Sequence, residues 1–202
     1  MNHGSEAKSK MSIILDELFS IIETVLMTLF IISMVFTFLL KIVTVKGSSM
    51  KDTLMPEDKL VTTAWCSSPE QGDIIIVDAS TALFIEKDGS LVYKTGLGKN
   101  IVKRVIAIEG QTVDIDFERG AVYVDGIMLD EAYVTGLTHL DEGAFTGQYP
   151  VTVPKDCVFV LGDNRAVSKD SRSDEIGFIE NDNIIGKVIF RLSPFEELGF
   201  VE

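Results

Sequence analysis

Three segments contain polar side chains that together could perform nucleophilic catalysis. A turn at residues 46–54 follows a long apolar run and presents two adjacent serines, Ser48 and Ser49. Lys103 lies in an aliphatic run at residues 101–106, and a charged segment follows at residues 162–172. A serine hydroxyl becomes a strong nucleophile when a nearby base removes its proton, and a neutral lysine amine can be that base. Taken alone, the serine turn is more often an ordinary surface turn.

The run around Lys103 predicts a strand that could lower the pKa of this lysine. Side chains alternate between the two faces of a strand, so one face should carry Ile101, Lys103, Val105 and Ala107, and the other Val102, Arg104 and Ile106. Loss of hydration around an ammonium group lowers its pKa, and a lysine base must be neutral near the working pH. The alternative, more common for such a segment alone, is a solvent-facing lysine that protects an edge strand from aggregation.

Together the three segments resemble the bacterial type I signal peptidases, peptidase family S26. The family's nucleophile motif is Ser-Met-x-Pro-Thr-Leu, and residues 49–54 match it except at the proline, where Asp52 stands. The pair Lys103-Arg104 matches the family's Lys-Arg pair in a hydrophobic strand. The motif Gly-Asp-Asn-Arg-x-x-Ser-x-Asp-Ser-Arg matches residues 162–172 without a departure. The likeness covers practically the whole chain.

The resemblance implies a serine endopeptidase that removes N-terminal signal peptides from secreted preproteins with a Ser/Lys dyad. Lys103 would deprotonate Ser49, the alkoxide would attack a peptide carbonyl, and water would hydrolyse the acyl-enzyme with the same lysine as base. No histidine is required, and His3 and His139 lie in the N-terminal tail and in a polar loop. No cofactor and no metal are implied.

The resemblance also assigns supporting residues around the base. Ser168 would form a hydrogen bond with the Lys103 amine and orient it. Asp170 would pair with Arg172 and with Arg104 to brace the site. These roles follow from the matching motif positions alone.

Two positions depart from the pattern of some or all family members. The oxyanion would be held at least by the Ser49 backbone N–H, but the serine that some members carry two residues earlier is Gly47 here. Losing one such donor can cost about 3 kcal/mol, and Gly47 places the chain with the Gram-positive-like members. Asp52 is expected to face water and to form the turn in place of the family's proline. Proline at position 52 is therefore expected to be tolerated.

The implied substrate is a secretory preprotein that is cut after a small-x-small site. An extended peptide that adds to a domain edge places alternate side chains in pockets, so positions −1 and −3 could be recognised together. By alignment, the candidate pocket residues are Val43, Val45, Met50, Leu54, Leu60 and Val102. A place in the core is the alternative for each of them.

An apolar run at residues 18–41 is long enough to cross a bilayer, which takes about 20 residues as a helix. Residues 24–40 lack a polar face, unlike a helix that covers a soluble core. A secretory signal has a shorter apolar region followed by a small-x-small site. We expect a short cytoplasmic tail at residues 1–17 with a disordered start, a transmembrane signal anchor at residues 18–41 and an extracytoplasmic catalytic domain at residues 42–202.

The orientation of this anchor cannot be chosen by counting basic residues, because lysines lie on both sides of the apolar run. The resemblance implies a single-pass protein of the bacterial cell membrane, with its N-terminus in the cytoplasm and its domain outside. The lipid bilayer is then a partner.

Short β-branched segments separated by glycines predict a mostly β, antiparallel domain. They lie at residues 59–65, 72–77, 90–93, 100–108, 112–117, 121–124, 152–153, 157–161 and 187–192. Residues 136–150, rich in glycine, threonine and acidic residues, are predicted to form a loop or small insertion. The resemblance implies the antiparallel β-sheet fold of the signal peptidase/LexA-like type, preceded by one transmembrane helix.

The charge and the cysteine content limit the other functions. Residues 42–202 contain 15 basic and 27 acidic residues, which makes nucleic acid a poor partner. Cys66 and Cys157, with two histidines in the chain, do not suit a zinc site of four ligands. We expect both cysteines to be small buried residues, and a single disulfide between them stays an alternative.

Three alternative functions share some of these features. A self-cleaving repressor of the LexA-like kind has the dyad and the β fold, but it needs a DNA-binding helix-turn-helix domain where this chain has a lipid-compatible helix. An archaeal or endoplasmic-reticulum-type signal peptidase would carry histidine at position 103. A membrane-tethered β module could bind partners without catalysis. The set of preproteins and the oligomeric state are not specified by the sequence.

Overall fold

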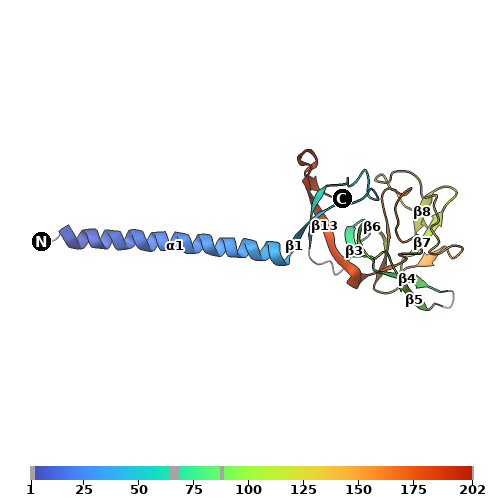
Figure 1. The fold of residues 1–202 in the computed structure, drawn as a ribbon, viewed down its shortest axis with the longest axis horizontal. Coiled ribbons are helices and arrows are strands. Elements are labelled where there is room, and N and C mark those ends of the chain that lie inside the picture. The colour runs from blue at the N-terminus through green and yellow to red at the C-terminus, as the bar shows by residue number, and fades with distance from the viewer. Residues whose placement is uncertain (1–2, 64–68, 87–88, 202) are drawn as a thin grey trace. The chain divides into compact units, whose positions relative to one another are not determined.

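The computed structural model describes residues 3–63, 69–86 and 89–201. The chain divides into two units, residues 1–40 and 41–202. The first unit is dominated by one long helix, α1 (His3–Phe38) (Figure 1). Its segment Leu15–Phe38 has a mean hydropathy of 2.3, and its apolar side chains are not buried. By length and composition, this segment could cross a membrane.

The bounds of α1 differ from the sequence expectation at both ends. The helix includes residues 3–10, which we expected to be disordered. Alanine, glutamate and lysine in this segment are strong helix formers, which accounts for the difference. At the other end, Leu40 and Lys41 of the predicted anchor begin the strand β1 (Leu40–Thr44), where β-branched residues follow and favour an extended backbone.

The second unit consists of antiparallel sheets, so the predicted fold class is confirmed. The largest sheet has the spatial order β1, β2 (Lys59–Thr63), β13 (Ile184–Ser193), β3 (Ile74–Asp78), β6 (Asn100–Ile108), β11 (Cys157–Leu161) and β12 (Ile179–Glu180), and β14 (Gly199–Phe200) pairs with β13. The pairings along β2, β13, β3, β6 and β11 are antiparallel. Figure 1 shows β3 and β6 side by side within this sheet.

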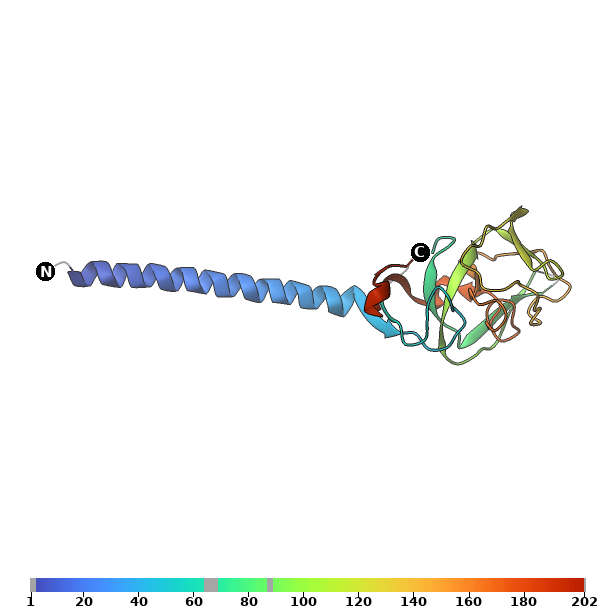
Figure 2. The same cartoon turned by 90° about the horizontal axis from the view of Figure 1, so that it is seen from above.

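Two smaller sheets and two short 3₁₀ helices complete the domain. A four-stranded sheet has the order β10 (Val151–Thr152), β7 (Thr112–Asp116), β8 (Ala121–Val124) and β9 (Ile127–Met128). The strands β4 (Thr81–Ile85) and β5 (Leu91–Thr95) form a hairpin. The 3₁₀ helices are η1 (Asn181–Asn183) and η2 (Phe195–Glu197). In both views, β7 and β8 lie at the opposite end of the domain from β13 (Figures 1 and 2).

The predicted strands agree with the structure most closely where the apolar pattern is long or well bounded. β6, β8 and β11 have the predicted bounds. β1 and β4 were not predicted, and β9, β12 and β14 are only two residues long, too short for a period-2 pattern. The last two residues of the strand predicted at 59–65, and Cys66, lie outside the described residues. Cys157 is buried in the core.

A β-bulge interrupts the predicted alternation of β6. Val105 packs in one apolar cluster and Val102 in another, as opposite faces require. Ile106 and Ala107 instead both pack in a third cluster. The register of β11 against β6 shifts between Phe159 and Val160, which leaves one extra residue on β6. Because a bulge re-aims the side chains that follow it, Ala107 does not continue the alternation of Lys103.

The loop predicted at residues 136–150 contains no named strand, but it contributes to the core. Phe145 is fully buried, and its ring packs against Phe178 with centroids 4.8 Å apart. Phe84 and Phe159 lie within 6.2 Å of the same ring. The loop therefore supports the sheets around it rather than lying freely on the surface.

We expect Phe145→Ala to lower the free energy of unfolding by about 3–5 kcal/mol, the usual cost of deleting a buried aromatic ring. Urea denaturation of the full-length chain in detergent measures this change. Phe195→Ala is the matched control, because Phe195 is 83% exposed and its loss should change stability by less than about 0.5 kcal/mol. Similar stability of the two variants would contradict a core role for this loop.

Candidate active site

The loop between β1 and β2 holds Ser49 in a fixed turn. Val45, Met50 and Leu54 are buried in one apolar cluster beneath this loop. The Val45 N–H donates to the Asp58 carbonyl at 2.9 Å, and the Leu54 N–H donates to the Met50 carbonyl at 2.7 Å. Apolar burial and backbone hydrogen bonds thus fix the turn on both sides of the serine.

The loop that follows β11 holds the same turn from another direction. The backbone N–H of Asn164 donates to the Ser49 carbonyl at 3.0 Å, and its side-chain Nδ2 donates to the Ser48 carbonyl at 3.1 Å. The Thr53 hydroxyl donates to Asp163 Oδ2 at 2.6 Å. Two consecutive residues of this loop, Asp163 and Asn164, therefore bind the turn that carries Ser49 on both sides of the serine.

Lys103 of β6 lies against Ser49. Its Nζ donates to Ser49 Oγ at 2.7 Å and to the Val102 carbonyl at 2.9 Å. The lysine is only 2% exposed, and this burial lowers its pKa to about 8, although the negative charge of Asp170 acts in the opposite direction. The structure thus brings together a hydroxyl and an amine that is neutral in mildly alkaline solution.

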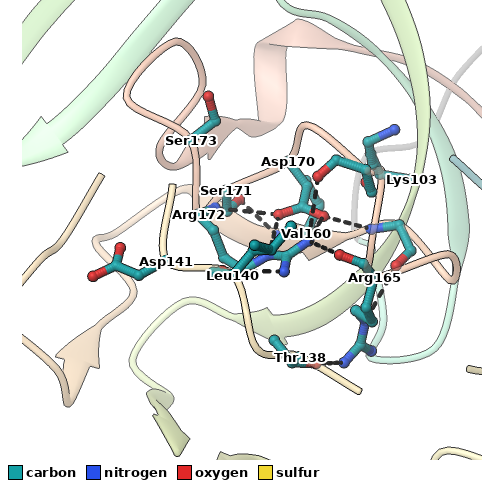
Figure 3. A network of polar contacts seen from close by, with 12 residues as sticks. Lys103, Thr138, Leu140, Asp141, Val160, Arg165, Asp170, Ser171, Arg172 and Ser173 are labelled. Carbon is teal, nitrogen blue, oxygen red and sulfur yellow. Dashed lines mark hydrogen bonds and ion pairs between the residues drawn. The ribbon is translucent and has the colours of Figure 1, made fainter. Parts of the chain in front are cut away.

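Asp170 and Arg172 form a fully buried ion pair near Lys103. Arg172 Nε donates to Asp170 Oδ1 at 2.8 Å and Nη2 donates to Oδ2 at 2.9 Å. The Gly162 N–H donates to Asp170 Oδ2 at 3.0 Å. Burial alone would raise the pKa of the Asp170 carboxyl, but the hydrogen bonds and charge of Arg172 hold it below its usual range. Figure 3 shows this network, with Lys103 at its border.

Arg104 pairs with Asp163, whereas we expected it to pair with Asp170. Its Nε donates to Asp163 Oδ1 at 3.0 Å and its Nη2 donates to Oδ2 at 2.8 Å. The guanidinium also lies over the ring of Tyr133, 3.9 Å from the centroid. Consecutive side chains of a strand point to opposite faces, so Arg104 points away from the face that carries Lys103. The predicted pairing of Asp170 with Arg172 is present, and the pairing with Arg104 is corrected.

The Ser168 side chain is buried, and its hydroxyl helps to hold the pKa of the Asp170 carboxyl below its usual range. The hydrogen bond that we expected between Ser168 and the Lys103 amine is not observed, because Lys103 Nζ donates to Ser49 Oγ and to the Val102 carbonyl. Gly162 lies beside Ser168, because a Cβ at this glycine would come within 2.1 Å of Ser168 Oγ and 2.5 Å of the Ser49 carbonyl. Only glycine fits between Ser168 and the turn that carries Ser49 without a shift of the backbone.

A groove of about 660 Å³ opens at Ser49 and Lys103. Four of the predicted pocket residues line it, namely Val43, Val45, Met50 and Val102. Leu54 and Leu60 do not line the groove, because both are fully buried in the apolar cluster beneath it. These two residues are corrected from pocket to core, the alternative that the sequence left open.

Asp52 is exposed, as we expected, and its carboxylate accepts a hydrogen bond from the Thr135 hydroxyl. Its φ angle is 68°, in the left-handed region. Proline is locked near −65°, so it cannot adopt this backbone. The expectation that proline would be tolerated at position 52 is therefore revised.

Sequence reasoning gave no role to Asp163, Asn164, Thr53 or Tyr133. The first two belong to the segment at residues 162–172 and Thr53 belongs to the nucleophile motif, so their motif positions were a signal that could have been used. Nothing in the sequence around Tyr133 indicates its contact with Arg104. Such a contact depends on the folding of a loop that has no regular pattern.

The chain is similar to signal peptidases over most of its length. The family described as "Signal peptidase, peptidase S26" matches residues 18–193, which include the three segments at residues 46–54, 101–106 and 162–172. Signal peptidase IB of Staphylococcus aureus (strain MRSA252) is 32% identical over 196 residues, covering 91% of this chain and 94% of that protein. Signal peptidase I of Bacillus caldolyticus is 32% identical over 166 residues, covering 77% and 81%. A crystal structure of a signal peptidase I from Enterococcus faecalis V583 is 25% identical, covers 59% of this chain and 96% of that chain, and has a TM-score of 0.42.

We expect Asp52→Pro to destabilise the domain by more than about 1 kcal/mol, because proline is incompatible with a positive φ. Asp52→Asn should cost much less, since asparagine tolerates the left-handed region and its amide oxygen can still accept a hydrogen bond from Thr135. Thermal denaturation of both variants measures the difference. Equal melting temperatures for the two would show that the turn rearranges freely.

Proposed function

This chain belongs to the signal peptidase family, peptidase S26, and we propose that it cleaves signal peptides with Ser49 as nucleophile and Lys103 as base. Family membership makes it a serine peptidase that acts on secretory preproteins. The observation that carries the dyad proposal is the 2.7 Å contact between Lys103 Nζ and Ser49 Oγ. In that contact, a buried amine of lowered pKa meets a hydroxyl that opens onto the groove.

The proposed reaction begins with the neutral Lys103 amine. Nζ accepts the Ser49 hydroxyl proton while Oγ attacks the peptide carbonyl, and the resulting ammonium gives that proton to the leaving amine. The products of this half are the free mature chain and an ester between Ser49 and the signal peptide. The amine, neutral again, then deprotonates a water molecule, which hydrolyses the ester and restores the serine.

The oxyanion is proposed to bind the backbone N–H of Ser49. This N–H forms no hydrogen bond among the described residues, so it remains available to a substrate oxygen. Gly47 has a φ of 90° and no side chain to add a second donor. One N–H supplies part of the stabilisation that such a site requires.

The surrounding residues are proposed to position the dyad. Asp170 and Arg172 hold the loop after β11, and Gly162 joins that loop to the serine turn. Ser168 is proposed to accept a hydrogen bond from the Lys103 amine in the course of the reaction. The burial of its hydroxyl beside Gly162, which also approaches the Ser49 carbonyl, supports this role.

The membrane arrangement is proposed from α1 and from the family. The apolar segment Leu15–Phe38 would anchor the chain in the bilayer, in place of the span expected at residues 18–41. The residues before it would form the cytoplasmic tail, and the chain from β1 (Leu40–Thr44) onward would form the extracytoplasmic catalytic domain. A preprotein would enter the groove as an extended strand. Small side chains at −1 and −3 would face the apolar part of its lining, formed by Val43, Val45, Met50 and Val102.

We expect Ser49→Ala and Lys103→Ala each to abolish cleavage, and Lys103→Arg to be equally inactive because guanidinium stays protonated at working pH. The detergent-solubilised chain is incubated with a preprotein, and the new N-terminus is sequenced. Lys155→Ala, a change in an exposed turn, is the control and should cleave normally. Substantial activity in any of these three variants, with the mature product carrying the correct N-terminus, would exclude the Ser49–Lys103 dyad.

The pH profile should show the titration of Lys103. Burial lowers the pKa of this amine to about 8, and only the neutral form can accept a proton. We therefore expect kcat/KM to fall about tenfold for each pH unit below that pKa and to level off above it. Cleavage rates across a pH series test this. A profile that is already flat at pH values well below 8 would exclude Lys103 as the titrating base.

A further inference from the structure

The groove at Ser49 is cationic on a domain that is otherwise strongly acidic. Its lining contains Lys46, Lys99, Lys103 and Lys169, and no aspartate or glutamate among the described residues. Residues 42–202 as a whole contain 27 acidic and 15 basic residues. The sign of the charge in the groove is thus opposite to that of the domain.

The four lysines are not equivalent. Lys103 is buried and serves as the proposed base. Lys169 forms an ion pair with Glu175, so part of its charge is neutralised. Lys46 and Lys99 are exposed, and neither has an ion-pair partner in the described part of the chain. Two unpaired cations therefore remain at the rim of the groove.

Lys99 acts electrostatically on the reacting centre. Its positive charge lowers the pKa of Lys103 further, after the larger effect of burial. Both lysines line the same groove, and Coulomb interactions are strongest over such short ranges, before distance and solvent screening weaken them. A charge on a substrate residue bound beside Lys99 would interact with Lys99 in the same way.

We propose that the groove selects preproteins by charge, favouring carboxylates and disfavouring lysine or arginine beside the cleaved bond, with Lys46 and Lys99 as the discriminating residues. This inference rests on the proposed function. Side chains of an extended peptide alternate, so when −1 and −3 face the apolar lining, −2 faces away from it. Position −2 and the first mature residues are thus the ones free to meet the rim.

The test uses the full-length chain in detergent and one preprotein with a small-x-small site. Asp, Asn or Lys is placed in turn at positions −2, +1 and +2, and kcat and KM are measured at a pH well above the pKa of Lys103. At one or more positions we expect kcat/KM to fall in the order Asp, Asn, Lys, by about two- to fivefold per step, the size of an exposed charge pair. The effect should lie mainly in KM and weaken as salt is added.

Charge variants of the enzyme identify the residues responsible. Lys99→Gln should reduce the preference and Lys99→Glu should reverse it, with the ratio between substrates compared within each variant. Lys155→Glu is the matched control, because it makes the same change in net charge on an exposed turn whose lysine does not line the groove. Its substrate preference should equal that of the unmodified chain.

Two outcomes would overturn the inference while the proposed function stands. The unmodified chain could cleave all charge variants of the preprotein equally. Alternatively, Lys155→Glu could change the substrate preference as much as Lys99→Glu does. The preference would then depend on the net charge of the enzyme and not on the groove. Failure of the unmodified chain to cleave any of these preproteins would instead contradict the proposed function itself.

Discussion

The burial of one lysine amine against one serine hydroxyl is the constraint on which the rest of this domain depends. A shift of the Lys103 pKa from 10.5 to about 8 corresponds to about 3 kcal/mol against the charged form. Because the folded-state pKa lies below the unfolded one, this penalty is complete below pH 8 and disappears as the pH rises past 10.5. Other interactions of the fold must offset that cost, and the strand that carries Lys103, β6, is paired on both sides, with β3 and β11, in the largest sheet.

The same strand also links Lys103 to the turn that carries Ser49. Lys103 faces Ser49, and the next residue, Arg104, is held by Asp163, which also accepts a hydrogen bond from Thr53. Asp163 therefore joins β6 to the loop that carries the serine. Removing one partner of a buried ion pair costs about 3–5 kcal/mol, because the other charge is left without compensation. The relative position of hydroxyl and amine is thus fixed by a contact in which neither takes part.

The sequence predicted those features that depend on a local pattern. The strand β6 and the closeness of Ser49 and Lys103 followed from an aliphatic run and from matching motifs. The sequence could not predict which carboxylate pairs with Arg104, because that pairing depends on how the loop after β11 folds back. Leu54 and Met50 are equally apolar in sequence, yet only Met50 reaches the groove. The positive φ of Asp52 could not be predicted from the sequence either, since aspartate is compatible with several turn geometries.

The positive charge of Lys99 would have two electrostatic effects that oppose each other. Its charge favours the neutral form of Lys103, which the proposed mechanism requires, and it would also attract a carboxylate on the substrate. A carboxylate bound there would offset the charge of Lys99 and raise the pKa of Lys103 again. Tighter binding of an acidic segment would then be accompanied by a smaller fraction of neutral base near pH 8. If the proposal holds, the benefit of such a substrate would be greatest at a pH where Lys103 is already neutral, and charge selection and base activation would share one residue at the rim of the groove.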